Sequence, residues 1–434
     1  MNKKNTQRHR QAPPAPKGGP TRPTRSEHTV FRQICNLIPG HLIPKLEREF
    51  QIDTRGFSCT SHVQALLFGH ASHALSLNDI CDALAVHEAE FGRIRGASAP
   101  ARNTFSNANR TREPAMAEAL YWQMLEHLQS ICPSFTQYRK HAGFLHRLKR
   151  DIFAMDSTTL QLTLRSIDWA RHRRRKAAAK CHMRLDIGTF LPTCVVVEDA
   201  AHHDSVRAAA LCAGMGPDDV LLADRAYVDL AFLADLNARG ILFVLRPKVN
   251  MLFRTIRKCP CSGKMLRDAI VRPAGVKTTA AYPGLLRLVT AMVEVDGVER
   301  EMTFITNHMD WSARTIAELY RARWAIETFF KEIKQTLQLR DFVGTNEQAV
   351  KWQVWTGLLT HLLLRFLRHV SRWGHSFSRC VGIVRSALWV KTVLIDLLHC
   401  YGTAGGPHRP LPCDKEPFLP GFEACSSRPM GQHG

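Results

Sequence analysis

Five polar residues in the C-terminal third of the sequence are spaced so that they would share one face of a helix. They follow one another at intervals of 3, 4, 4 and 3 residues, and they are Tyr320, Arg323, Glu327, Lys331 and Lys334. Since successive helical residues are rotated by about 100°, all five fall beside a stripe of apolar residues that would be buried. A carboxylate flanked by cations in this way could serve a site that holds phosphate groups. A solvated ladder of ion pairs is the alternative, but it explains neither the tyrosine nor the excess of cations.

Two aspartates occur in a common context, each directly after a short apolar run. Asp156 follows residues 152–155, and Asp224 follows residues 220–223. We interpret the runs as strands, and α/β sheets place their chemistry at the C-terminal ends of strands. A single aspartate of this kind could be a cap or turn residue, whereas two indicate a site more strongly. With Glu327 they would supply hard oxygen ligands, which suit Mg²⁺ or Mn²⁺.

The composition agrees with a polyanionic substrate. Two metal ions about 3.5–4 Å apart can activate a water or a 3′-hydroxyl and stabilise the leaving oxygen of a phosphodiester. The 434 residues include 59 Lys and Arg against 38 Asp and Glu, a formal net charge of +21. This favours nucleic acid over a membrane, because charged residues and histidines interrupt even the apolar segment 354–370. The N-terminus has no apolar run of the signal-peptide kind, so we expect an intracellular protein without a membrane partner.

The elements that must position these residues can be outlined from the pattern of the sequence. A helical pattern dominates the N-terminal part, and short apolar runs alternating with helices follow. A β-like stretch with Gly and Pro interrupts this alternation before the chain becomes helical again. We predict a disordered basic tail (1–26), a helical DNA-binding domain (27–147), a catalytic domain (148–246 and 303–345), a β-rich insertion (247–302), C-terminal helices (346–401) and a poorly ordered tail (402–434).

Two further segments could contact nucleic acid. Residues 102–110 are rich in Arg, Asn, Ser and Thr, and could form the recognition helix of a helix-turn-helix unit, or else a polar loop or a solvated helix face. Residues 171–176 form a dense basic run, which we expect to contact phosphates, the alternative being a solvated loop. The residues predicted to bind DNA in these segments are Asn103, Asn107, Arg110, Arg173, Arg174 and Arg175.

The helical stripe and the two aspartates together resemble the motifs of a known family. Tyr320-x2-Arg323-x3-Glu327-x6-Lys334 is a Y-R-E-K signature. With it, the chain resembles the DDE transposases of the insertion-sequence-four family. The segment Asp156-Ser157-Thr158-Thr159 is similar to the first catalytic region of that family, and Ala223-Asp224-Arg225-Ala226-Tyr227 is similar to the second.

The resemblance implies a fold, a chemistry and partners. The fold is α/β: a ribonuclease-H-like mixed sheet with a β-rich insertion, preceded by an all-α domain and followed by C-terminal helices. The implied metal ligands are Asp156, Asp224 and Glu327, with two Mg²⁺ ions per active site, for which Mn²⁺ can substitute. The signature residues Tyr320, Arg323 and Lys334 would contact the DNA end near the scissile phosphate. Lys331, on the same helical face, is also predicted to bind DNA. The implied partners are double-stranded DNA, as inverted-repeat ends and as target, and a second copy in a homodimeric synaptic complex at the bacterial nucleoid in the cytoplasm.

Some alternatives stay open at this point. Residues 225–310 contain no tryptophan, whereas some relatives insert one there to hold a flipped base, so formation of a hairpin intermediate is left open. Four rival acids fit the ligand role less well, and these are Asp186, Asp199, Asp204 and Glu332. The alternative functions are a domesticated DNA-binding protein that does not cut, and a metal-dependent nuclease that does not join strands. The complete set of acids and the intact signature argue against a decayed enzyme.

Overall fold

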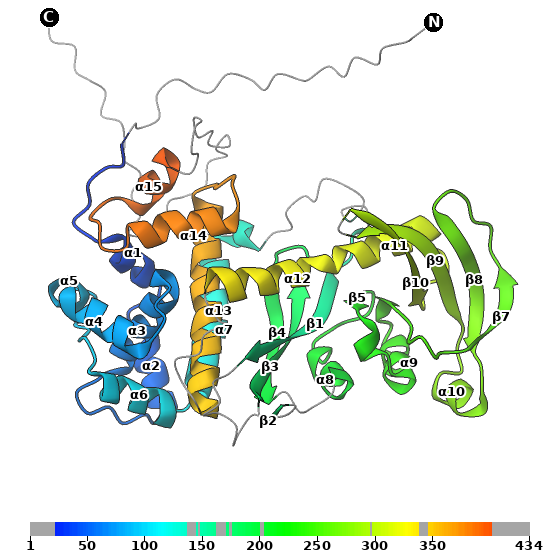
Figure 1. The fold of residues 1–434 in the computed structure, drawn as a ribbon, viewed down its shortest axis with the longest axis horizontal. Helices are drawn as coiled ribbons and strands as arrows, with labels where there is room; N and C mark the ends of the chain where they lie inside the picture. The colour runs from blue at the N-terminus through cyan, green and yellow to red at the C-terminus, as the bar shows by residue number, and fades with distance from the viewer. Residues whose placement is uncertain are drawn as a thin grey trace, which may run out of the picture. The chain divides into compact units, whose positions relative to one another are not determined.

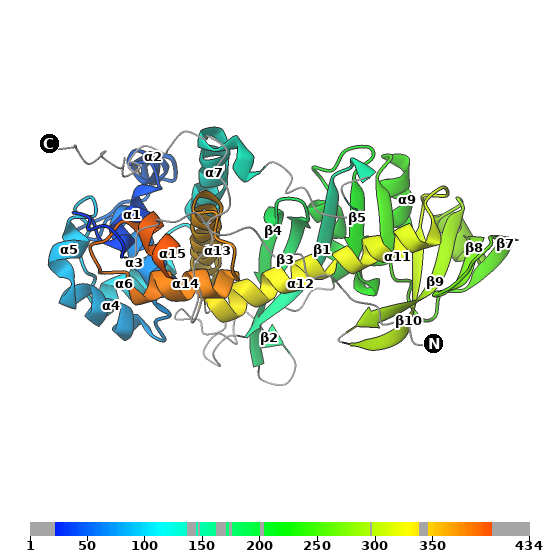
Figure 2. The same cartoon turned by 90° about the horizontal axis from the view of Figure 1, so that it is seen from above.

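The computed structural model describes residues 22–136, 145, 148–161, 171–172, 176–199, 204–295, 297–337 and 346–401 (Figures 1 and 2). The chain forms two compact units. One comprises residues 1–38 and 363–434, and the other comprises residues 39–362. No helix within the described ranges is long and apolar enough to cross a membrane.

The first unit joins an N-terminal segment to the C-terminal helices. Its helices are α1 (Val30–Asn36), α14 (Phe377–Ser386) and α15 (Leu394–Cys400). The Gln33 amide donates to the Thr392 carbonyl at 2.7 Å and accepts from the Leu394 N–H at 2.9 Å. The Thr24 carbonyl, within the predicted basic tail, accepts from the Val393 N–H at 2.8 Å. These bonds satisfy buried backbone groups before and at the start of α15, while residues 1–21 and 402–434 lie outside the described residues.

The second unit begins with a helical region. Its elements are α2 (Leu42–Glu49), α3 (Cys59–Ser72), α4 (Leu77–Val86), α5 (Glu88–Gly92), α6 (Arg102–Thr111), α7 (Ala115–Ile131) and the 3₁₀ turn η1 (Pro133–Phe135). Ser76 caps α4, because its hydroxyl accepts from the Asp79 N–H at 3.2 Å. The part of α13 (Glu347–Val370) that belongs to this unit packs here: the Trp352 ring lies 4.5 Å from that of His62, and its N–H donates to the Arg112 carbonyl. The helical region therefore shares a core with α13.

A mixed sheet follows the helical region. Its first elements are β1 (Ile152–Gln161), β2 (Arg171–His172), β3 (Lys176–Asp186), β4 (Leu191–Asp199), α8 (Asp204–Leu211), β5 (Val220–Ala223), the 3₁₀ turn η4 (Arg225–Tyr227), α9 (Leu230–Ala238) and β6 (Leu242–Leu245). The strand order is β4-β3-β1-β5-β6, with β3 antiparallel to both neighbours and β1, β5 and β6 parallel. This is the order of a ribonuclease-H-like sheet, so the predicted fold class is confirmed.

The β-rich insertion continues this sheet. It contains β7 (Phe253–Lys258), β8 (Met265–Pro273), α10 (Val276–Ala281), β9 (Leu286–Val295) and β10 (Val298–Thr306). Strand β10 pairs antiparallel with β6, with Ile305 opposite Leu245, and the order then runs β10-β9-β8-β7. Leu286 and Leu288 of β9 are buried in a core shared with Phe243 of β6. The insertion is therefore an extension of the catalytic sheet, joined to it by backbone hydrogen bonds and by a common core.

The predicted helix of Glu327 runs across the strands of the sheet (Figures 1 and 2). It is built from α11 (Ala313–Ala322), α12 (Trp324–Lys331) and a π-helical turn, η5 (Glu332–Thr336). It begins at Ser312, whose hydroxyl accepts from the Thr315 N–H at 3.0 Å. Leu319 and Ile326 are buried, as the apolar stripe predicts. The π turn holds more residues than an α-helical turn, so helical spacing alone does not put Lys334 on the face of Glu327.

Candidate active site

Asp156 lies in β1, and Asp224 directly follows the neighbouring parallel strand β5. Met155 of β1 is paired with Ala223 of β5, so Asp156 and Asp224 follow directly at the same edge of the parallel pair. The sequence predicted that Asp156 ends its strand. The structure differs, because β1 continues to Gln161 by pairing with β3. One Asp156 oxygen accepts from the Ser157 N–H at 2.8 Å. The sheet therefore brings together two carboxylates that are far apart in the sequence.

Arg323 joins Asp156 to the third carboxylate. Its Nη1 lies 3.0 Å from Asp156 Oδ2, and its Nη2 lies 2.5 Å from Glu327 Oε1. The guanidinium is buried, and its Cζ lies 5.4 Å from the centre of the Tyr320 ring. The Tyr320 hydroxyl in turn donates to Asp224 Oδ1 at 3.4 Å. Two signature residues thus contact all three predicted carboxylates, and these contacts define one site.

Lys334 reaches the sheet from the π turn. Its Nζ donates to the Thr159 carbonyl of β1 at 2.8 Å, three residues beyond Asp156. The π turn is fixed by Glu332, whose Oε2 lies 3.1 Å from Nε2 of the buried His361 of α13. Glu332 was expected on the surface, and its side chain instead contacts the buried His361, because the helix packs against α13. Lys331 is exposed and makes no hydrogen bond or ion pair with a described residue.

The electrostatics of the site reflect its burial. Burial raises the pKa of Asp156 to about 6, an effect that Arg323 opposes and that the nearby Glu327 and Asp224 carboxylates reinforce. Burial also raises the pKa of Tyr320 to about 12, so its hydroxyl stays protonated and donates to Asp224. Burial and the neighbouring carboxylates therefore make the charged form of Asp156 unfavourable, and a cation bound beside it would stabilise that form.

The chemistry of these side chains fits a divalent metal ion. Carboxylate oxygens are the ligands that Mg²⁺ and Mn²⁺ prefer. Among the described residues, no group of three or more His, Cys, Asp and Glu side chains is close enough to hold a metal. The Arg323 guanidinium contacts both Asp156 and Glu327 and supplies positive charge at these two carboxylates.

The other predicted DNA contacts lie apart from this site or outside the described residues. Asn103, Asn107 and Arg110 are exposed on α6, whose opposite face is buried through Phe105, and the Arg110 guanidinium donates to Asn107 Oδ1 at 3.0 Å. Residues 173–175, which hold the three predicted arginines, lie outside the described residues. Of the rival acids, Asp186 caps a turn by accepting from the Gly188 N–H at 2.7 Å. The side chains of Asp199 and Asp204 are not among those described.

Comparison with known proteins agrees with this geometry. The family model described as "Transposase DDE domain" matches residues 147–363, which include all three carboxylates and the signature. The chain belongs to the DDE transposase family. A domain of unknown function also matches residues 26–91 of this DDE transposase.

Two relatives illustrate the extent of the similarity. The chain is 27% identical over 224 residues to a probable transposase for insertion sequence element IS5377 of Geobacillus stearothermophilus, covering 51% of this chain and 58% of that protein. It is 27% identical over 243 residues to the putative transposase y4zB of Sinorhizobium fredii, covering 55% of this chain and 66% of that protein. A solved structure, the piggyBac transposase synaptic complex with hairpin DNA, superposes with a TM-score of 0.43 at 10% identity, covering 86% of this chain and 83% of that one.

Proposed function

We propose that the chain is the transposase of an insertion sequence. In this proposal it binds the inverted-repeat ends of its element as double-stranded DNA, cleaves them, and transfers the 3′ ends into target DNA. The observation that carries the proposal is the meeting of Asp156, Asp224 and Glu327 through Arg323 and Tyr320. Residues so far apart in the sequence would not share one network of hydrogen bonds if they served only local capping.

The three carboxylates would hold two Mg²⁺ ions, or Mn²⁺ in their place. When bound, such ions activate a water or a 3′-hydroxyl and stabilise the leaving oxygen of a phosphodiester. Arg323 and Lys334 would hold phosphate oxygens of the DNA end. Arg323 already contacts the Asp156 carboxylate, and Lys334 already contacts the β1 backbone at Thr159. Without DNA and metal, Arg323 balances the charge of two carboxylates that would otherwise repel each other.

The element end would be read by α6. Asn103, Asn107 and Arg110 lie on its exposed side, and amide and guanidinium groups are the side chains that pair with base edges in the major groove. A homodimer would bring two ends together in the synaptic complex. The protein would act at the nucleoid of a bacterial cell.

An excision and joining assay tests this proposal. The purified protein, Mg²⁺ and a plasmid that carries the gene with its natural flanking DNA would be incubated with a second, target plasmid. We expect a released linear element and joined products bounded by short target duplications. Release without joining would instead support a metal-dependent nuclease, and end binding without release would support a domesticated DNA-binding protein; either result would overturn the proposal.

A further inference from the structure

The outer part of the insertion carries positive charge that the active site does not use. Residues 246–281 contain nine Lys or Arg residues and a single acid, Asp268. All of these cations except Arg246 are exposed. Asp268 is buried, and its oxygens accept from Arg287 Nε at 2.9 Å and Nη2 at 2.7 Å. The only acid of the segment is therefore already neutralised by a cation that lies outside it.

Three of the arginines share one face of the antiparallel pair β7 and β8, here named the β7–β8 ribbon. Arg254 stands directly opposite Arg272, and Arg257 stands opposite Ile270, two residues from Arg272. Directly paired residues point to the same face, with Cβ atoms about 4.5–5.5 Å apart, and so do residues two apart on a strand. Like charges directly opposite each other destabilise a sheet, and a bound anion would relieve this repulsion.

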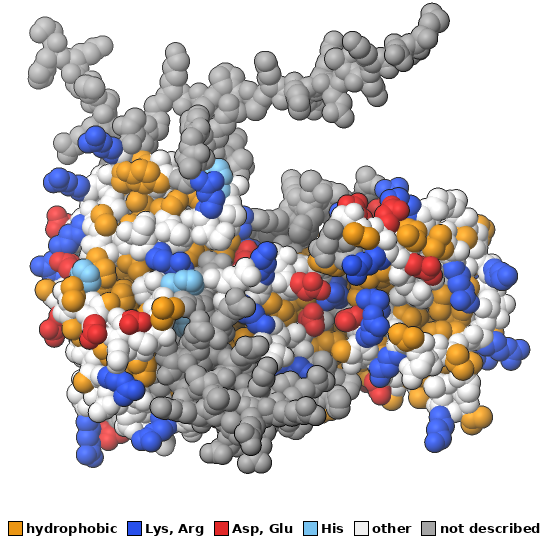
Figure 3. All heavy atoms as spheres, viewed as in Figure 1, with side chains coloured by type: hydrophobic (Ala, Val, Ile, Leu, Met, Phe, Trp, Pro, Cys, Tyr) orange, Lys and Arg blue, Asp and Glu red, His pale blue; other side chains and the backbone are white. Residues whose placement is uncertain are grey.

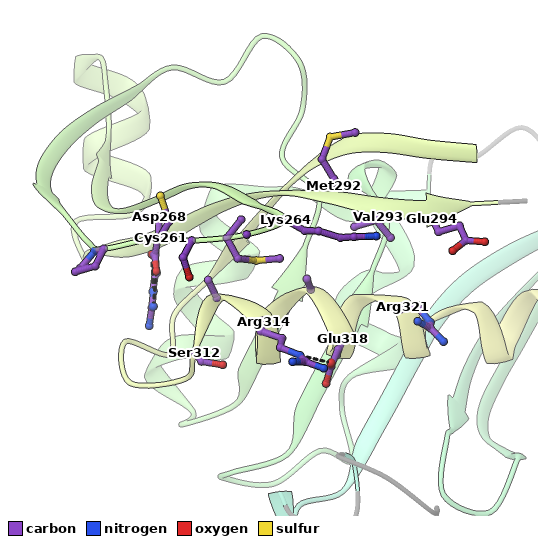
Figure 4. A pocket seen from close by; sticks show the side chains of 17 residues that line it. Cys261, Lys264, Asp268, Met292, Val293, Glu294, Ser312, Arg314, Glu318 and Arg321 are labelled. Atoms are coloured by element: carbon purple, nitrogen blue, oxygen red, sulfur yellow. Dashed lines mark hydrogen bonds and ion pairs between the residues drawn. The ribbon is translucent and has the colours of Figure 1, made fainter. Parts of the chain in front are cut away.

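The cavity beside the ribbon has a different character. It has a volume of about 810 Å³ and lies between β8, β9 and α11 (Figure 4). At its rim, Lys264 Nζ lies 2.5 Å from Glu299 Oε1, and Arg314 Nε lies 2.8 Å from Glu318 Oε1. These cations already have carboxylate partners. By contrast, no described carboxylate forms an ion pair with the three ribbon arginines.

We propose that the β7–β8 ribbon binds the phosphate backbone of duplex DNA as a second surface, remote from the catalytic carboxylates. The inference rests on the proposed function only in taking DNA as the substrate. Arginine binds phosphate oxygens through two parallel hydrogen bonds, and a two-stranded ribbon fits the major groove. Figure 3 shows Lys and Arg side chains exposed over the insertion on the face in view.

The sheet sets the distance between the two surfaces. In the strand order, six steps separate β7 from β1, which carries Asp156. At about 4.8 Å a strand, the separation measured across the strands is about 29 Å. Since base pairs are stacked about 3.4 Å apart, a duplex that contacts both surfaces must extend roughly 8 base pairs from the cut. A shorter duplex can occupy one surface but not both.

A pair of matched variants tests the proposal. Arg254→Gln with Arg272→Gln removes two charges from the ribbon. Lys264→Gln with Arg314→Gln removes the same charge from two ion-paired residues of the same region. Fluorescence anisotropy in EDTA would measure binding of mixed-sequence duplexes of about 6 base pairs, closed by a hairpin loop, and of about 30 base pairs over a range of salt concentrations. For the longer duplex, the slope of log K against log salt should be less steep by about 1.8 in the ribbon variant and unchanged in the control.

The two duplex lengths test the geometry. The ratio of affinities for the long and the short duplex should fall in the ribbon variant and stay unchanged in the control. Equal salt slopes in the two variants would overturn the proposal. The alternative role of these cations is to hinder pairing between the edge strands of two copies. This alternative predicts that the ribbon variant self-associates in sedimentation while its DNA affinity is unchanged. Such a result would also overturn the proposal. Because EDTA prevents metal-dependent cleavage, this outcome is independent of the excision assay.

Discussion

Arg323 is the residue whose removal probes the electrostatics of the site most sharply. Its side chain is 8% exposed, and it joins Asp156, which is 23% exposed, to Glu327, which is 42% exposed. Arg323→Met keeps most of the aliphatic volume beside the Tyr320 ring and removes the charge. Removal of one partner from a buried ion pair costs about 3–5 kcal/mol. Since water screens Glu327, we expect a loss of about 2–3 kcal/mol, or about 3–5 °C in the thermal midpoint of a unit of this size.

The assay is thermal unfolding in EDTA at neutral pH, followed by circular dichroism. Arg314→Met is the matched control, because Arg314 lies in α11 and forms an ion pair with Glu318 at 2.8 Å but is 81% exposed. Exposed pairs of this kind contribute little, so we expect no measurable change in the midpoint.

The pH dependence separates charge from packing. The pKa of Asp156 is about 6 in the folded protein and about 4 in the unfolded chain. Folding is therefore accompanied by uptake of a proton at pH values between about 4 and 6. Stability that depends on this carboxyl is lost as the pH rises through that window. The deficit of Arg323→Met relative to wild type should therefore be largest above about pH 7 and shrink below about pH 5. A deficit that does not change with pH would refute the electrostatic reasoning.

Three further changes test the signature helix and α6. Lys334→Met should slow cleavage of a pre-bound DNA end by roughly 10- to 150-fold in single-turnover assays, because one charge-assisted contact contributes about 1.5–3 kcal/mol. Substitution of the exposed Lys331 by Met should not slow this step. Glu332→Gln should slow the same step by misplacing Lys334, so adding it to Lys334→Met should cause no further loss, and additive losses would contradict this coupling. Asn107→Ala should reduce discrimination between the element end and random DNA by about 1–3 kcal/mol in competition binding, with unchanged nonspecific affinity.

The parts of the site that follow local rules could be predicted from the sequence. Asp156 and Asp224 were expected in one site because each directly follows a short apolar run, and the structure places these runs in neighbouring parallel strands. Ser76 could be assigned as a cap from its position alone. Glu327 could be placed beside Arg323 because residues four apart on a helix are neighbours.

The contacts that depend on distant pairing could not be predicted. The bridge from Arg323 to Asp156 spans 167 residues, and no spacing rule encodes it. The π turn at Glu332 depends on His361, a residue of a different helix that packs against it. The pairing of β10 with β6 likewise joins segments separated by the whole insertion, so the sequence indicated a β-rich insertion but not that its strands continue the same sheet.

The central claim is that three carboxylates form one metal-dependent site that cleaves DNA. The most direct measurement is single-turnover cleavage of a duplex carrying the element end in Mg²⁺, compared with binding of the same duplex. The variants to compare with wild type are Asp156→Asn, Asp224→Asn and Glu327→Gln. The account predicts that each variant binds the end with wild-type affinity and does not cleave it. Wild-type cleavage by any one of them would remove that residue from the site and contradict the account.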